Sequence, residues 1–108
     1  MVEIKEKVDE EKIVLQVFGE VDASSSIHLD KALEEAVAQH KIILVDLSNL
    51  EYISSAGLGV FMSYLDQIKE EGIHFALFGL KESVYHVFEI LGMDQVLRIE
   101  KSLAEAMT

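Results

Sequence analysis

Ser54 and Ser55 stand side by side, shortly before an apolar repeat at helical spacing that begins at Leu58. Serine is a favoured N-cap residue, so one hydroxyl of the pair is expected to cap this helix. A phosphate on the other would add about 1.5 to 2 negative charges beside the free N–H groups and the positive dipole end of the helix. The pair therefore predicts a helix start that tolerates phosphorylation, with the added charge acting on any partner docked there.

The glycines that follow do not form a phosphate-binding loop. After Gly57 and Gly59, a dinucleotide fingerprint requires a third glycine where this chain has Met62. The Gly-Lys-Ser/Thr sequence of a Walker loop is absent as well. We expect the two glycines to let the helix approach the sheet closely instead.

No catalytic or metal-binding constellation surrounds the serines. A hydrolase elbow, Gly-x-Ser-x-Gly, would need a glycine where Ile53 stands. The histidines are expected to be structural or surface residues, because none pairs with a serine or stands at metal-ligand spacing with carboxylates. They are His28, His40, His74 and His86. We therefore expect no enzyme activity, no cofactor and no metal.

Two carboxylates are placed where loops build sites in α/β proteins. Asp22 and Asp46 each follow or end a predicted strand, and strand ends on one rim of such a sheet commonly carry function. N-capping or hydrogen bonding within a loop would explain both residues equally well. The sequence leaves these two interpretations open.

Composition limits the kind of partner. The chain has 108 residues, no Cys, and 9 basic against 20 acidic residues, for a net charge of −11. The lack of Cys excludes disulfides and zinc-thiolate sites, and the acidity argues against nucleic acid or an anionic membrane as partner. With no apolar run of membrane-spanning length and no signal peptide, we expect a cytoplasmic protein, monomeric, with one domain over residues 1–108.

Hydrophobic patterning predicts strands alternating with helices. Residues 2–8 and 13–18 are expected to pair as a hairpin, and the apolar run 42–47 is typical of a strand buried on both faces. Further strands are expected over 73–78 and 95–99, helices over 24–40, 54–71, 84–91 and 102–107, and a connecting loop over 48–53. The order β-β-α-β-α-β-α-β-α predicts an α/β fold with a mixed sheet of four or five strands and about four helices.

The segment from Ile43 to Val60 resembles the signature of STAS domains, most of all that of bacterial anti-sigma-factor antagonists. The matching features are the strand ending Val-Asp-Leu-Ser, the aromatic-aliphatic pair Tyr52-Ile53, and the serines followed by Gly and Leu-Gly. The upstream Gly19-Glu20-Val21-Asp22 is similar to the family's Gly-Glu-hydrophobic-Asp turn. The resemblance covers nearly the whole chain.

This resemblance implies a phosphorylation switch. The unmodified protein would bind an anti-sigma factor that is also a serine kinase, and so free a sigma factor. The kinase would phosphorylate a serine at the start of the second helix, the modified protein would dissociate, and a PP2C-type phosphatase would reset it. In this mechanism the protein is a substrate and a switch.

The sequence departs from the family's Asp-Ser-Ser/Thr-Gly at two positions. The Asp is replaced by Ser54 and the second hydroxyl residue by Ala56, so Ser55 is the expected acceptor and Ser54 the alternative. The resemblance implies a docking surface before the first helix and at the start of the second, comprising Asp22, Ala23, Ser24, Ile53, Ser54, Ser55, Ala56, Gly57, Leu58 and Gly59. Ile53 and Leu58 would either form its apolar centre or belong to the core.

Three other interpretations remain open. The chain could be a STAS interaction module of a stress-sensing or transporter-associated complex, without a phosphorylation switch. It could bind a small ligand or nucleotide, although it lacks a Walker loop. An enzyme would need a pocket with a perturbed acid or base, which the sequence does not reveal.

Overall fold

A computed structural model describes residues 1–108, and its centre is a five-stranded sheet in the order β1-β2-β3-β4-β5. β1 (Val2–Asp9) and β2 (Lys12–Val21) form an antiparallel hairpin. β3 (Ile42–Ile53), β4 (His74–Phe78) and β5 (Ile99–Glu100) run parallel to β2. The predicted mixed sheet with helices between its parallel strands is confirmed.

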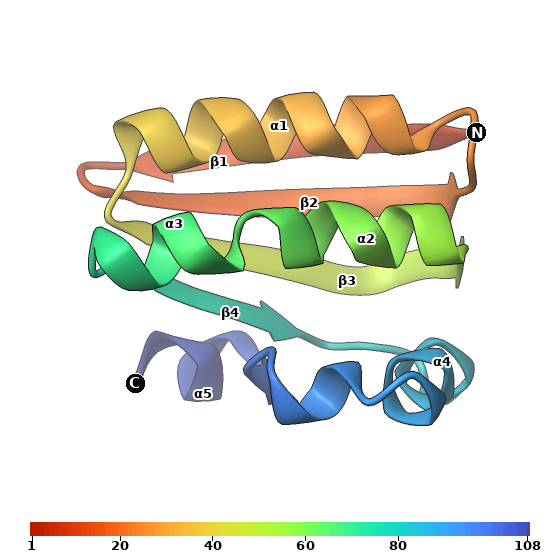
Figure 1. The fold of residues 1–108 in the computed structure, drawn as a ribbon. Helices are drawn as coiled ribbons and strands as arrows, with labels where there is room; N and C mark the ends of the chain where they lie inside the picture. Colours follow the sequence, from red (N-terminus) through yellow and green to blue (C-terminus); the bar gives the residue numbers. More distant parts are fainter.

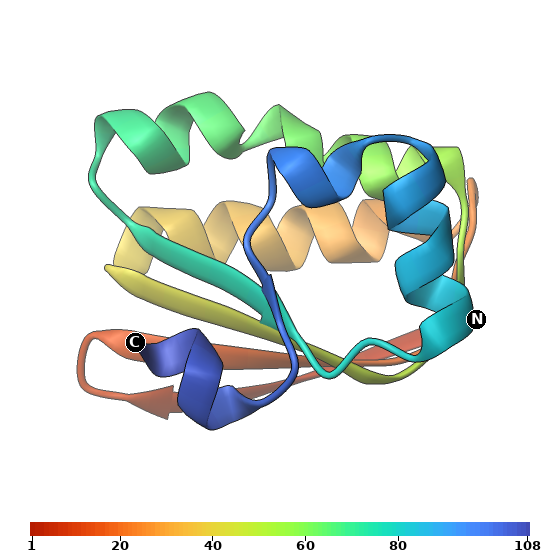
Figure 2. The ribbon, with the colours of Figure 1, turned by 90° about the horizontal axis from the view of Figure 1, so that it is seen from below.

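Helices cover the two faces of the sheet unequally (Figures 1 and 2). α1, α2 and α3 lie on one face, α5 lies on the other, and α4 lies near the end of the sheet where β2 and β3 finish. The bounds are α1 Ser26–Gln39, α2 Ser55–Ser63, α3 Leu65–Glu70, α4 Glu82–Ile90 and α5 Leu103–Met107, with a 3-10 turn at Met93–Gln95. No helix is long and apolar enough to span a membrane.

The main core lies between the sheet and its helix-rich face. Phe61 of α2 is fully buried and packs between Phe75 and Phe88, with ring centroids 6.5 and 6.2 Å away. On the opposite face, α5 covers a small cluster in which Leu44 of β3 is buried with Ala106. The predicted burial of β3 on both faces is therefore confirmed for the centre of the strand. On the second face, the short helix α5 covers it.

The predicted loop over residues 48–53 is wrong, because β3 continues to Ile53. Its pairing with β2 shifts register after Asp46 and again after Leu50, and these irregularities accommodate the polar residues. Asp46 accepts hydrogen bonds from the backbone N–H and the hydroxyl of Ser48, at 3.0 and 2.7 Å. This contact lies at the first register shift, and the strand continues beyond it.

Two other predicted elements differ from the structure. The single helix expected over 54–71 is broken at Tyr64, whose hydroxyl donates to the Asp30 carboxylate of α1 at 2.7 Å. The expected last strand over 95–99 is mostly a 3-10 turn and an irregular segment, and β5 has two residues. The expected helix ends are confirmed at Gly72 and Gly92, which adopt left-handed φ values of 66° and 72°.

Candidate functional site

The two segments singled out in the sequence meet where β2 and β3 end. The backbone N–H of Ser54 donates to the Val21 carbonyl at 2.8 Å, which joins the end of β2 to the start of α2. A Cβ atom added to Gly57 would lie 2.8 Å from a Val21 methyl group and 2.7 Å from Ile53 Cγ1. The predicted close approach of helix to sheet is thus confirmed for Gly57, and it requires a glycine there.

Asp22 organises the turn between β2 and α1. Its Oδ1 atom accepts from the backbone N–H and hydroxyl of Ser24 at 3.0 and 2.8 Å, and from those of Ser25 at 2.9 and 3.0 Å. These bonds, led by that of the Ser24 hydroxyl, favour the ionised carboxylate and lower the pKa of Asp22 from 3.8 to about 2. The turn therefore holds a permanent negative charge beside the start of α2.

The two serines have different environments. Ser54 is half-buried and is the N-cap of α2, where its Oγ accepts a long 3.4 Å bond from the Gly57 N–H. Ser55 is exposed, is the first residue of α2, and its hydroxyl has no hydrogen-bond partner in the chain. The backbone N–H groups of Ser55 and Ala56 point out of the first helical turn, where no intrahelical carbonyl can accept from them. The arrangement leaves one accessible hydroxyl beside two free donors.

Of the ten predicted docking residues, five are exposed, three are buried, and Asp22 and Ser54 are half-buried. Ala23 and Ser24 are exposed in the Asp22 turn, as are Ser55, Ala56 and Gly59 at α2. The buried members are Ile53, Gly57 and Leu58. Of the two roles left open for Ile53 and Leu58, the structure assigns the core. A Cβ on Gly59 would meet nothing within 4 Å, so the close approach predicted there is wrong.

The two segments that form the site carry only negative charge. Residues 19–27 and 51–59 include Glu20, Asp22 and Glu51 and contain no Lys or Arg. The nearby cation Lys81 already contacts Glu51, with 2.5 Å between Nζ and Oε2. A phosphate on Ser55 would therefore find helix N–H groups in its own chain and no side-chain cation from either segment.

The other candidate residues lie outside this site. Asp46 is inside β3, in register with Phe78 at the end of β4, so the prediction that it sits at a strand end is wrong. His74 lies in β4, where its Nε2 is 2.7 Å from the Ala106 carbonyl of α5. His28 and His86 are exposed on α1 and α4, and His40 follows the last residue of α1. The structure contains no group of three or more acidic or histidine side chains that could hold a metal.

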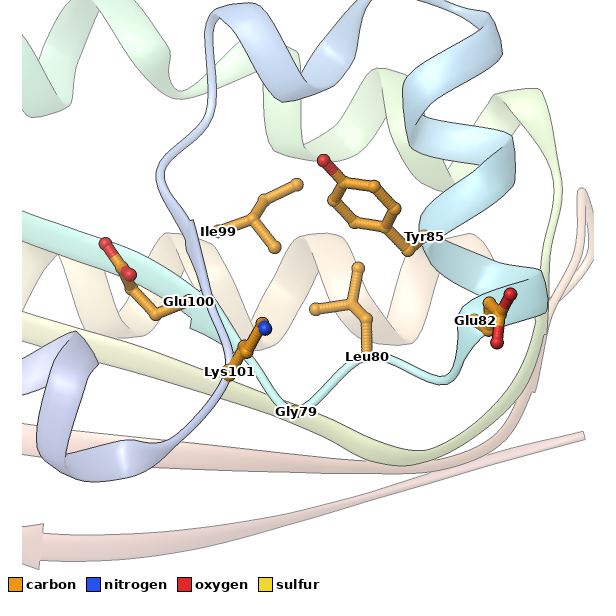
Figure 3. Close-up of a pocket in the computed structure, with 7 residues that line it drawn as sticks. All are labelled: Gly79, Leu80, Glu82, Tyr85, Ile99, Glu100 and Lys101. Carbon is orange, nitrogen blue, oxygen red and sulfur yellow. The ribbon is translucent and has the colours of Figure 1, made fainter.

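A cavity of about 670 Å³ lies near the ends of β4 and β5 (Figure 3). Leu80, Tyr85 and Ile99 gather at its centre. Its charged lining consists of Glu82, Glu100 and Lys101, so carboxylates outnumber cations. Two carboxylates against one cation are unfavourable for a polyanion, which gives little support to the nucleotide alternative.

Two exposed apolar residues of the two segments that form the site were not among the predicted docking residues. Ile27, in the first turn of α1, is 66% exposed, and Tyr52, two residues before Ser54, is 51% exposed. Ile27 falls outside the buried helical stripe that contains Leu29 and Leu33, so helical spacing could have identified it. Tyr52 could not be placed from alternation, because the register shifts of β3 change which residues face the core.

Comparison with known proteins gives consistent results over nearly the full chain. A family model described as STAS domain matches residues 1–106. The anti-sigma-B factor antagonist of Listeria monocytogenes is 34% identical over 100 residues, which cover 92% of this chain and 87% of that protein.

Solved structures share the fold. An anti-sigma factor antagonist from Mycobacterium paratuberculosis has a TM-score of 0.89 at 20% identity, covering 99% of this chain and 92% of the other. The anti-sigma factor antagonist SpoIIAA of Bacillus, solved in unphosphorylated and phosphorylated forms, gives TM-scores of 0.79 and 0.72 at 18% and 17% identity. These matches cover 99% of this chain and 93% and 96% of SpoIIAA.

Proposed function

Because the chain belongs to the STAS domain family, we propose that it is an anti-sigma-factor antagonist. In its unmodified form it binds an anti-sigma factor that is also a serine kinase, and this frees the sigma factor. It acts as a binding protein and a kinase substrate, and does not catalyse a reaction. The name of the Listeria relative and the shared fold support this proposal.

The main support for the proposed switch is the environment of the Ser55 hydroxyl. Its hydroxyl is exposed and unbonded, whereas that of Ser54 accepts the capping bond from Gly57. A kinase could therefore modify Ser55 without removing the cap of α2. We assign Ser55 as the acceptor on this basis. Ala56, which follows it, has no hydroxyl to accept a phosphate.

Phosphorylation would act on the partner and leave the fold intact. The free N–H groups and dipole of α2 favour a phosphate at its first residue. The surrounding Glu20, Asp22 and Glu51 supply no counter-charge, so the phosphate adds bulk and negative charge to the docking surface. The complex with the anti-sigma factor then dissociates, and a PP2C-type phosphatase restores the binding form.

A displacement assay tests this function directly. The unmodified protein is titrated into a preformed complex of a sigma factor with its anti-sigma kinase from the same organism, with sigma release followed by fluorescence anisotropy. We expect stoichiometric release by the wild type and by Ser55→Ala, and none by Ser55→Glu. The function would be contradicted if the wild-type protein neither bound any of the organism's anti-sigma kinases nor released a sigma factor from them. Equal release by Ser55→Glu would contradict the switch alone.

A further inference from the structure

The apolar part of the docking surface must come from residues other than Ile53 and Leu58, since both are buried in the core. We propose that Tyr52 and Ile27 are the apolar residues of the docking surface, and that the anti-sigma factor covers both when it binds around Ser55. This inference rests on the proposed function. The partner would meet them with apolar recesses bordered by Lys and Arg side chains.

The backbone places both residues on the two segments that are joined at Ser54. Tyr52 is three residues before Ser55 in β3, and its register partner in β2 is Glu20. Ile27 is the second residue of α1, shortly after the Asp22 turn, and the Ser26 N–H donates to the Asp22 carbonyl at 2.9 Å. Since Ser54 is bonded to Val21, both segments are tied to the same point of the sheet. The starts of α1 and α2 lie at the same end of the molecule (Figure 1).

Ile27 and Tyr52 are the exposed large hydrophobic residues of the segments 19–27 and 51–59. Ile27 and Tyr52 leave more than half of their surface in water while 27 other hydrophobic residues are buried. Aromatic residues are enriched among those that dominate binding energy, and Tyr loses little conformational entropy when it is covered. The two side chains can therefore supply the apolar centre that a stable interface needs.

The charge of the surface specifies the partner's chemistry. Asp22 stays ionised down to low pH, because the Ser24 and Ser25 bonds lower its pKa, and Glu20 and Glu51 lie on neighbouring strands. Glu20 Oε1 lies 3.9 Å from the Met1 amino group and Glu51 contacts Lys81, whereas Asp22 has no ion-pair partner. A basic surface on the partner would gain in attraction and in association rate, with an affinity that falls as salt rises.

The test uses alanine variants with controls of similar exposure. Tyr52→Ala and Ile27→Ala are compared with Met107→Ala and Val8→Ala, whose side chains are 40% and 59% exposed. Val8 lies beside the β1–β2 turn and Met107 ends α5, at the other end of the molecule from the starts of α1 and α2 (Figure 1). Affinity for the purified anti-sigma kinase is measured by calorimetry, at two salt concentrations, after thermal melting has established that each variant is folded.

We expect Tyr52→Ala to weaken binding by about 10-fold or more and Ile27→Ala by about 3-fold or more, with both controls within about 2-fold of the wild type. If an alanine variant melts early, Tyr52→Gln or Ile27→Gln takes its place. Wild-type binding together with unchanged affinity of both site variants would overturn this inference and leave the proposed function standing. Absence of wild-type binding would overturn both.

Discussion

The backbone N–H of Ser54 donates a 2.8 Å hydrogen bond to the carbonyl oxygen of Val21. Val21 ends β2 and Ser54 caps α2, so one main-chain bond joins the turn that carries Asp22 to the helix that carries Ser55. Val21 and Ile53, which end β2 and β3, are both buried. The candidate surface is therefore built on the end of the sheet, and this bond joins its two parts.

Gly57→Ala should destabilise the protein, because the new Cβ would lie 2.7 Å from Ile53 Cγ1 and 2.8 Å from Val21 Cγ1. We expect a loss of about 1–3 kcal/mol in the free energy of unfolding, which is usual for overpacking a core. Urea unfolding measures this loss. Gly59→Ala is the matched control in the same helix, because its Cβ would meet nothing within 4 Å, and it should stabilise α2 by up to about 1 kcal/mol. Equal effects of the two substitutions would contradict the account of Gly57.

Ser54 and Ser55 should differ in their contribution to stability. Ser54→Ala removes the cap on the Gly57 N–H and should cost about 1 kcal/mol. Ser55→Ala removes a hydroxyl without a partner and should change the free energy of unfolding by less than about 0.5 kcal/mol. Ser54→Asp, which introduces the family's usual residue, should retain the cap and the stability. A larger loss for Ser55→Ala than for Ser54→Ala in thermal or urea unfolding would reverse the assignment.

Asp22 should make stability depend on pH in the acid range. The folded protein lowers the pKa of Asp22 from 3.8 to about 2, through the hydroxyl of Ser24 and the backbone and hydroxyl of Ser25. A depressed folded-state pKa contributes stability that is fully present above pH 4 and is lost as pH falls toward 2. Asp22→Asn should therefore be less stable than the wild type at pH 7, with a difference that shrinks between pH 4 and pH 2. A difference that stays constant with pH in urea unfolding would contradict this.

Tyr64→Phe should weaken the junction between α1 and the broken helix. The substitution removes hydrogen bonds from the Tyr64 hydroxyl to the Asp30 carboxylate at 2.7 Å and to the Asp30 carbonyl at 3.1 Å. Because Tyr64 is half-buried, we expect the free energy of unfolding, measured in urea, to fall by about 1 kcal/mol. Tyr85→Phe is the control, because the Tyr85 hydroxyl has no partner within the chain, and it should be neutral. A neutral Tyr64→Phe would show that the bond does not stabilise the fold.

The sequence predicts the order of elements because each element has a distinct local pattern. Strands are apolar runs such as 42–47, helices repeat apolar residues at helical spacing, and glycines mark helix ends. It does not predict the break at Tyr64, since the contact with Asp30 joins residues 34 positions apart. The extension of β3 depends on register shifts against β2, which local patterning does not encode. Local patterning does place Ser54 and Ser55 at the start of a helix. It does not show that Ile53 is buried and Tyr52 exposed, because this too depends on the register shifts.

Intact-mass spectrometry after incubation with ATP and the cognate anti-sigma kinase tests the central claim most directly. We predict one added phosphate on the wild type and on Ser54→Ala, and none on Ser55→Ala, with the fold of each variant checked by circular dichroism. Loss of the phosphate only in Ser54→Ala would contradict the assignment of Ser55. Absence of any phosphate on a wild-type protein that binds the kinase would contradict the switch itself.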